Sequence, residues 1–196
     1  MPIVRIVLLL ISLSLSGLAH SALEIEISGG GAQQLPIAIV PFAQSQPNSD
    51  NLSQIIQADL KRSGLFRLLE TAGVTSRPSD ISQIKYAEWV ALQAQAVAVG
   101  KVETLPGNRY NVSFQLVDVL KQTQLASVQY NVTATQLRGT AHKIADVIYQ
   151  KLTGESGLFS SRIAYVAKLN GRYALRVADV DGENAVTMVS SKEPII

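Results

Sequence analysis

Residues 35–42 read Leu-Pro-Ile-Ala-Ile-Val-Pro-Phe, a nearly continuous apolar run with a proline near each end. Such a run, without alternating polar residues, is typical of a strand that is buried on both faces of a sheet. A second buried strand is predicted at residues 96–102, Ala-Val-Ala-Val-Gly-Lys-Val. The two runs predict the interior of a sheet, and amphipathic segments lie between and after them.

Three helices are predicted around these strands. The first begins after a capping residue, Ser49 or Asp50, and ends at Gly64. Its apolar residues recur at helical spacing and are Leu52, Ile55, Ile56 and Leu60. The second is predicted over residues 81–94, and its buried side is formed by Ile84, Trp89, Val90 and Leu92 to Ala94. The third covers residues 136–152, ends at Gly154 and buries Leu137, Ala141, Ile144, Ala145, Ile148 and Leu152.

Three more strands complete this part of the chain. Residues 65–70 form a short strand candidate, and residues 110–120 and 125–135 are predicted as neighbours because turn signals lie at 106–108 and 122–124. The order of elements over residues 35–154 predicts a mixed-sheet α/β amino-terminal domain. This domain is complete without any strand that comes earlier in the chain.

The residues before this domain divide into two segments. Arg5, an apolar run and several small residues predict a signal peptide over residues 1–21, cleaved after Ser21 or Ala22. The apolar run is too short to span a bilayer comfortably, although an uncleaved anchor is the alternative. Residues 22–34 then contain Leu23, Ile25 and Ile27 in alternation with polar residues, followed by three glycines. This pattern predicts a strand on a flexible hinge, which pairs either with its own domain or with another protein.

The sequence pattern of the last segment, residues 155–196, is typical of a small all-β unit. Strands are predicted at 162–167, 173–179 and 185–189, and the turns between them are Asn170-Gly171 and Asp179-Val180-Asp181-Gly182. Three short strands cannot bury a core of their own. They therefore predict one blade of a larger repeat architecture.

Composition and motifs provide little chemistry for an enzyme or a cofactor. The chain has a net charge of +2, so its composition does not indicate a nucleic-acid-binding surface. With no cysteine and two histidines, it has too few of the usual zinc ligands. His142 lies within a helix, where a packed or solvated side chain is the ordinary interpretation. Residues 179–184 begin like a calcium loop, but strands flank them and favour a turn. We therefore expect no catalytic residue, no metal and no cofactor.

Several motifs, in order, closely resemble the TolB family of periplasmic Tol–Pal proteins. They include Leu-Glu-Ile-Glu-Ile-Ser-Gly-Gly at 23–30, the run at 36–42 and Ala-Asp-Leu-Lys-Arg-Ser-Gly-Leu-Phe at 58–66. They continue with residues 110–118, 151–154, 159–166 and 175–182. The resemblance implies that residues 155–196 are the first, incomplete blade of an all-β six-bladed propeller. The family continues for five more blades, so the resemblance also implies a fragment or a truncated product.

The same resemblance implies a role in protein interaction and not in catalysis. The partner-binding residues for a TolA-like inner-membrane protein would be Ala22, Leu23, Glu24, Ile25, Glu26, Ile27, Ser28, Gly29 and Gly30. A Pal-like, peptidoglycan-associated lipoprotein would bind the propeller, so that the system maintains outer-membrane integrity, supports constriction at cell division and is exploited for bacteriocin import. The expected location is the periplasm, without membrane insertion after signal cleavage. The alternatives are a periplasmic ligand-binding domain and a propeller accessory domain of a serine peptidase.

Overall fold

The computed structural model describes residues 34–45 and 51–195 of the 196-residue chain. The predicted signal peptide and most of the predicted partner-binding segment, residues 22–33, lie outside the described residues. Within the described ranges, no helix is both long and apolar enough to cross a membrane.

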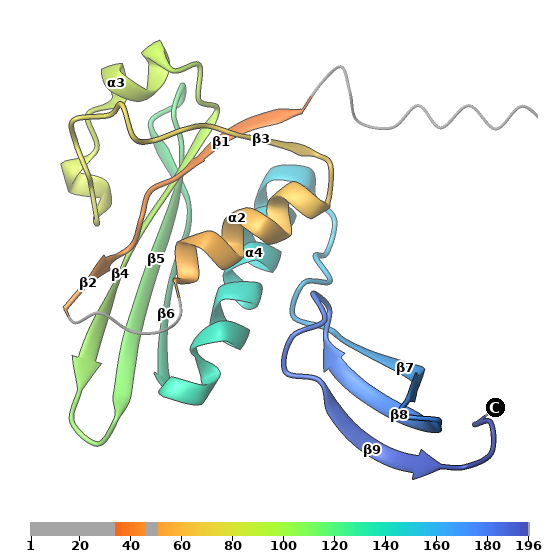
Figure 1. Ribbon diagram of the computed structural model, residues 1–196. Coiled ribbons are helices and arrows are strands. Elements are labelled where there is room, and N and C mark those ends of the chain that lie inside the picture. The colour runs from red at the N-terminus through yellow and green to blue at the C-terminus, as the bar shows by residue number, and fades with distance from the viewer. Residues whose placement is uncertain (1–33, 46–50, 196) are drawn as a thin grey trace, which may run out of the picture.

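A mixed sheet forms the centre of the first part of the molecule (Figure 1). Its main strands follow the spatial order β3-β1-β4-β5-β6, and β2 pairs separately with β4. The strands are β1 (Leu35–Ile39), β2 (Ala43–Gln44), β3 (Phe66–Leu68), β4 (Ala96–Leu105), β5 (Arg109–Asp118) and β6 (Thr123–Thr133). β1 is parallel to both β3 and β4, whereas β4, β5 and β6 are antiparallel. The predicted mixed-sheet α/β domain is thus confirmed.

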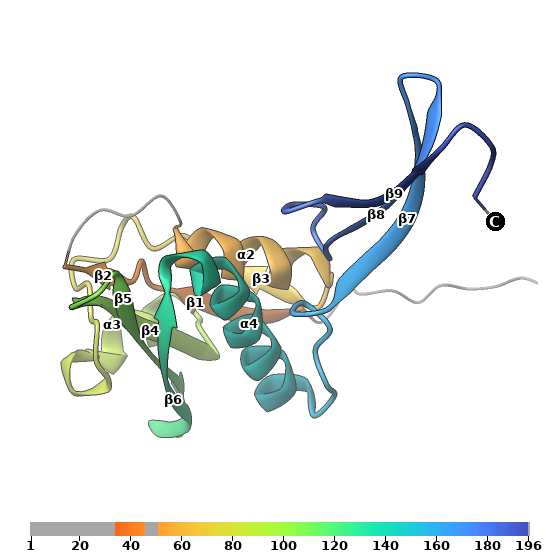
Figure 2. The ribbon, with the colours of Figure 1, turned by 90° about the horizontal axis from the view of Figure 1, so that it is seen from below.

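Two helices, α2 (Leu52–Arg62) and α4 (Leu137–Thr153), lie side by side over one face of this sheet (Figures 1 and 2). The short 3₁₀ turn η2 (Ala134–Gln136) leads into α4, and Gly154 ends α4 at a φ of +83°. The two helices bury the apolar residues predicted for them, with Ile55 and Leu152 only partly covered. The side chain of Asn51 caps α2 by accepting a hydrogen bond from the Gln54 amide, and the predicted capping residues, Ser49 and Asp50, lie outside the described residues.

The opposite face of the sheet is covered by a short irregular layer. It consists of the 3₁₀ turn η1 (Ile81–Gln83) and the helix α3 (Tyr86–Ala91), which bury Trp89 against Val97, Val99 and Val117. The predicted single helix over residues 81–94 is therefore wrong. Ile84 is extended and separates η1 from α3. Val90 and Leu92, predicted to be buried, are 46% and 37% exposed.

A separate antiparallel sheet follows α4 and projects away from the α/β part (Figure 2). Its strands, in spatial order, are β7 (Arg162–Leu169), β8 (Arg172–Asp179) and β9 (Val186–Ser191). Asn170 and Gly171 take positive φ values of 50° and 77°, which confirms the predicted tight hairpin turn. The sheet buries only Ala174 and Ala178 and exposes Ile163, Val166, Leu169, Val186, Met188 and Val189. As predicted, these three strands have no core of their own.

Candidate functional site

The predicted partner-binding residues, Ala22 to Gly30, lie outside the described residues, but the point where they join the domain is described. The Gln34 side-chain amide donates a hydrogen bond of 2.9 Å to the Gly64 carbonyl. The Leu35 amide donates another, also 2.9 Å long, to the Leu65 carbonyl. The turn between α2 and β3 therefore holds the chain where β1 begins.

β1 is an interior strand of the larger sheet, between β3 and β4. Leu35 to Ile37 pair with Phe66 to Leu68 of β3, and Ile37 to Ile39 pair with Ala96 to Ala98 of β4. Within the described residues, β3 and β6 lie at the two ends of the main strand order, and β2 pairs only with β4. A strand that preceded β1 could therefore join this sheet at an edge but not in its interior.

A groove of about 630 Å³ lies beside the same entry point. Its polar lining residues come from the position just before β1, from α2 and from the region of β3. They include Gln34, Gln54, Gln57, Lys61, Arg67 and Glu70. Amide side chains can both donate and accept hydrogen bonds, as the edge of an extended chain requires. The groove is thus suited to polar contacts with an extended segment.

A second polar feature is buried between α2, α4 and the β8–β9 turn. The His142 Nδ1 atom lies 2.6 Å from Asp59 Oδ2, and its Nε2 atom lies 3.6 Å from Asp181 Oδ2. Arg138, one turn before His142 on α4, donates to Asp181 and lies 4.0 Å from Asp179. Arg62 donates to the other Asp59 oxygen at 3.0 Å. We call Asp59, Arg62, Arg138, His142, Asp179 and Asp181 the junction cluster, because it joins the α/β part to the antiparallel sheet.

Burial makes the charges of the junction cluster interdependent. The side chains of His142 and Asp59 are 2% and 0% exposed. The hydrogen bond to Asp59 raises the pKa of His142 against the opposing effect of burial. Burial alone would raise the pKa of Asp181, but the Glu183 amide and the charges of Arg138 and His142 together lower it.

The spacing of His142, Asp179 and Asp181, with ligand atoms within 4.8 Å of one another, is compatible with a metal ion. The guanidinium of Arg138 contacts both carboxylates and already supplies the positive charge between them. We therefore interpret the group as an ion-pair cluster. Residues 179–182 form the predicted turn, in which the Gly182 amide donates to the Asp179 carbonyl at 2.8 Å.

No sequence motif marks this cluster, but polar residues on the apolar faces of two helices indicate part of it. Asp59 lies seven residues after Leu52, on the apolar side of α2, and His142 lies between the buried residues Ala141 and Ala145 of α4. A polar side chain on a buried helix face requires a polar partner. Two such residues on separate helices therefore indicate a buried pair.

Comparisons with known proteins agree with the fold and with these motifs. The family model of the TolB amino-terminal domain matches residues 23–125. A Tol-Pal system protein TolB from Methylobacillus flagellatus is 63% identical, with 92% of this chain and 42% of the relative covered. The protein of the same name from Thiobacillus denitrificans is 51% identical, with 96% of this chain and 44% of the relative covered.

A solved structure has a similar fold over most of this chain. The crystal structure of TolB from Acinetobacter baumannii matches with a TM-score of 0.74 and 37% identity, covering 87% of this chain and 42% of that one. The chain thus spans less than half the length of the relatives that it matches. The family model and these relatives show that the chain belongs to the TolB family of Tol–Pal system proteins.

Proposed function

We propose that the chain acts in the periplasm as a protein-interaction component of the Tol–Pal envelope complex. In this role it contributes to the link between a TolA-like inner-membrane protein and a Pal-like lipoprotein, and so to outer-membrane integrity and constriction at division. The observation that carries the proposal is the family match, which begins at residue 23, the first residue of the predicted partner strand. The role is binding and not catalysis, and the family does not favour a ligand-binding domain or a peptidase accessory domain.

The proposed contact with the TolA-like protein is the addition of one strand to an exposed sheet edge. Backbone hydrogen bonds from residues 23–27 would supply affinity, while Leu23, Ile25 and Ile27 would fill pockets on one side. The pairing of β1 with β3 and β4 supports this arrangement, because the interior of the larger sheet is already complete. Ordering a free strand costs conformational entropy, so the affinity should be modest.

The competing arrangement is that residues 23–27 lie along an edge of their own sheet. β3 is the nearer edge, because β3 pairs with β1 where the chain enters the domain. This arrangement also provides a masked state, from which the segment would be released when another region binds its partner. The two arrangements differ in what removal of the segment does to stability.

The test compares the mature chain with a variant that lacks residues 22–31. Binding to the purified periplasmic part of a TolA-like protein is measured by calorimetry, and stability by thermal melting. We expect binding to be lost and the melting temperature to stay nearly constant. A large drop in melting temperature, or unchanged binding, would refute the proposal.

A pair of point variants tests the backbone contact itself. Ile25→Pro removes one strand hydrogen-bond donor and should weaken binding, whereas Ile25→Val keeps the donor and a β-branched side chain and should bind nearly as well. Equal binding by both variants would argue against strand addition.

The antiparallel sheet of β7, β8 and β9 is proposed to be the first blade of the six-bladed propeller. Its exposed apolar residues support this assignment, because blades bury such residues against neighbouring blades. The Pal-like lipoprotein is expected to bind mainly the part of the relatives that this chain does not cover. The chain should therefore bind the TolA-like protein but bind the Pal-like lipoprotein more weakly than a full-length relative does.

A further inference from the structure

We propose that His142 is a proton-dependent clasp between the α/β part and the antiparallel sheet. When protonated, it joins Asp59 of α2 to Asp181 of the β8–β9 turn, and its deprotonation loosens the hold on that turn. The proposal is independent of which partner residues 22–34 bind.

The geometry around the imidazole ring carries this inference. The Nδ1 atom is 2.6 Å from Asp59, so the ring donates its Nδ1 proton to that carboxylate. The Nε2 atom is buried, has no hydrogen-bond partner among the described residues and lies 3.6 Å from an oxygen of Asp181. In the neutral ring, Nε2 would therefore point a lone pair at a carboxylate oxygen. In the protonated ring, Nε2 carries a proton directed at the same oxygen.

The charges on the surrounding elements favour the protonated ring. Asp59 and Arg62 face the cluster from α2, and Arg138 faces it from α4. Asp179 lies at the end of β8 and Asp181 in the turn that follows. Three carboxylates thus meet two guanidiniums, and an imidazolium makes the cluster neutral. Arg162 of β7 also lies 4.0 Å from Asp179, but its side chain is 56% exposed and contributes little.

The direction of the pH effect follows from these contacts. Asp59 raises the pKa of His142 above its ordinary value of 6.5. The contribution of the imidazolium to the clasp is therefore complete below pH 6.5 and is lost as the pH rises through the higher pKa of the folded state. The pKa of Asp181 is lowered, so this carboxylate stays charged throughout that range.

Other contacts limit what deprotonation releases. Arg138 still holds Asp181, so the clasp weakens and does not open completely. The connection before β7 stays attached to α4, because Asp146 accepts hydrogen bonds from the amides of Phe159 (2.7 Å) and Ser160 (3.0 Å). Deprotonation should therefore widen the range of positions of the antiparallel sheet and leave the α/β part folded.

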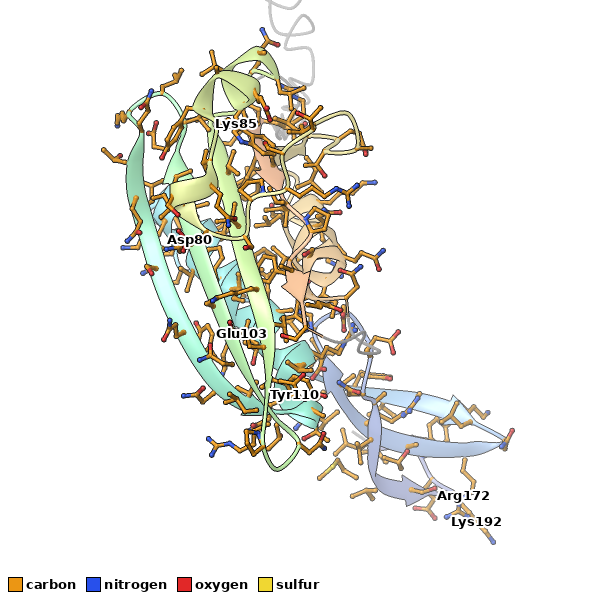
Figure 3. All side chains as sticks on the ribbon, turned by 90° about the vertical axis from the view of Figure 1, so that its left-hand side faces the viewer. Asp80, Lys85, Glu103, Tyr110, Arg172 and Lys192 are labelled. Carbon is orange, nitrogen blue, oxygen red and sulfur yellow. The ribbon has the colours of Figure 1, made fainter. Side chains whose placement is uncertain are left out.

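The experiment measures the distance between the two parts as a function of pH. The chain has no cysteine, so Lys121→Cys on the α/β part and Lys192→Cys on the antiparallel sheet would be the only labelling sites. Both positions are exposed, and Lys192 lies at the far end of the antiparallel sheet (Figure 3). Spin labels at both sites report the distance distribution. In the mature chain His142 is the single histidine, so its ring titration can be followed by NMR.

We expect a narrow distribution below pH 6.5 that broadens several-fold as the pH passes the His142 midpoint. Asp181→Asn should abolish this pH dependence and lower the midpoint, while the α/β part stays folded because Asp181 belongs to the turn. Glu183→Gln, in the same turn but with an exposed side chain, is the matched control and should behave like the parent. A distribution that does not change with pH, or that changes equally in Asp181→Asn, would overturn the proposal.

Discussion

Replacing Gly100 with alanine should destabilise the α/β part because the space above this glycine is already occupied. Gly100 lies in β4, opposite Phe114 of β5. A Cβ atom at this position would come within 2.5 Å of the Ser113 carbonyl oxygen and within 2.7 Å of the Phe42 ring. Ordinary van der Waals contacts between heavy atoms are roughly 3.5 Å. The ring can rotate away, but the carbonyl belongs to the paired strand and can move only with it.

The expected loss follows from this comparison. Adding one carbon to a well-packed interior costs about 1–3 kcal/mol, and the backbone clash places Gly100→Ala near the upper end of that range. With the urea dependence usual for a small domain, the unfolding midpoint should fall by roughly 1–2 M.

The single tryptophan provides the assay. Trp89 is fully buried against the sheet on the face opposite α2 and α4, so its fluorescence reports unfolding of the α/β part and not of the antiparallel sheet. Urea unfolding of the parent and of Gly100→Ala is followed by this signal at one pH.

The matched control is Gly139→Ala. Gly139 is exposed in the first turn of α4, and a Cβ atom added to it would meet no heavy atom within 4 Å apart from its chain neighbours and the backbone of its own helix. Alanine restricts the unfolded chain and favours the helix, so this variant should gain about 0.5 kcal/mol. An unchanged or raised midpoint for Gly100→Ala would refute the packing argument, as would a loss of equal size in both variants.

Two further predictions concern the end of α4 and the connection that follows it. Gly154→Ala should cost about 1–2 kcal/mol in the same urea assay, because the residue holds a φ of +83° while its surroundings are open; an unchanged midpoint would contradict this. Asp146→Ala should accelerate protease cleavage within residues 155–161 roughly tenfold, because the amides of Phe159 and Ser160 lose their acceptors. Asp146→Asn keeps one acceptor oxygen and should show a smaller increase, and equal cleavage in all three proteins would show that Asp146 does not anchor the connection.

Strong hydrophobic periodicity explains why most of the fold could be predicted. Residues 35–42 and 96–102 have few alternatives to a buried strand, and α4 shows its apolar stripe along most of its length. The hairpin at Asn170-Gly171 follows from local backbone preference alone. In these cases the local pattern and the tertiary packing favour the same structure.

The region of residues 81–94 shows where a local pattern fails. Its apolar residues fit one long helix, but Val90 and Leu92 stay exposed while Trp89 and Ile84 pack against the sheet, and Gln93 adopts a positive φ of 57°. Packing against the sheet therefore overrides the helical spacing. Helix propensity is a weak guide to structure where tertiary contacts bury only a few residues of a segment.

The junction cluster could not be assembled from the sequence for a different reason. Asp59 and His142 are 83 residues apart, and Arg138 and Asp181 are 43 residues apart. Asp59 and His142 each lie on the apolar face of a helix, but only the packing of α2 against α4 brings them together. The partner-binding segment remains a prediction, because residues 22–33 lie outside the part of the chain that the structure describes.

Amide hydrogen exchange at residues 23–27 tests most directly whether the strand predicted there pairs with another protein. The mature chain is measured alone and with the periplasmic part of a TolA-like protein, and the amides of Ile37 and Ile39 in β1 serve as the protected internal reference. We expect the five amides to exchange rapidly in the chain alone and to become protected when the partner is bound. Protection as strong as that of β1 in the chain alone, without a further change on adding the partner, would contradict the account.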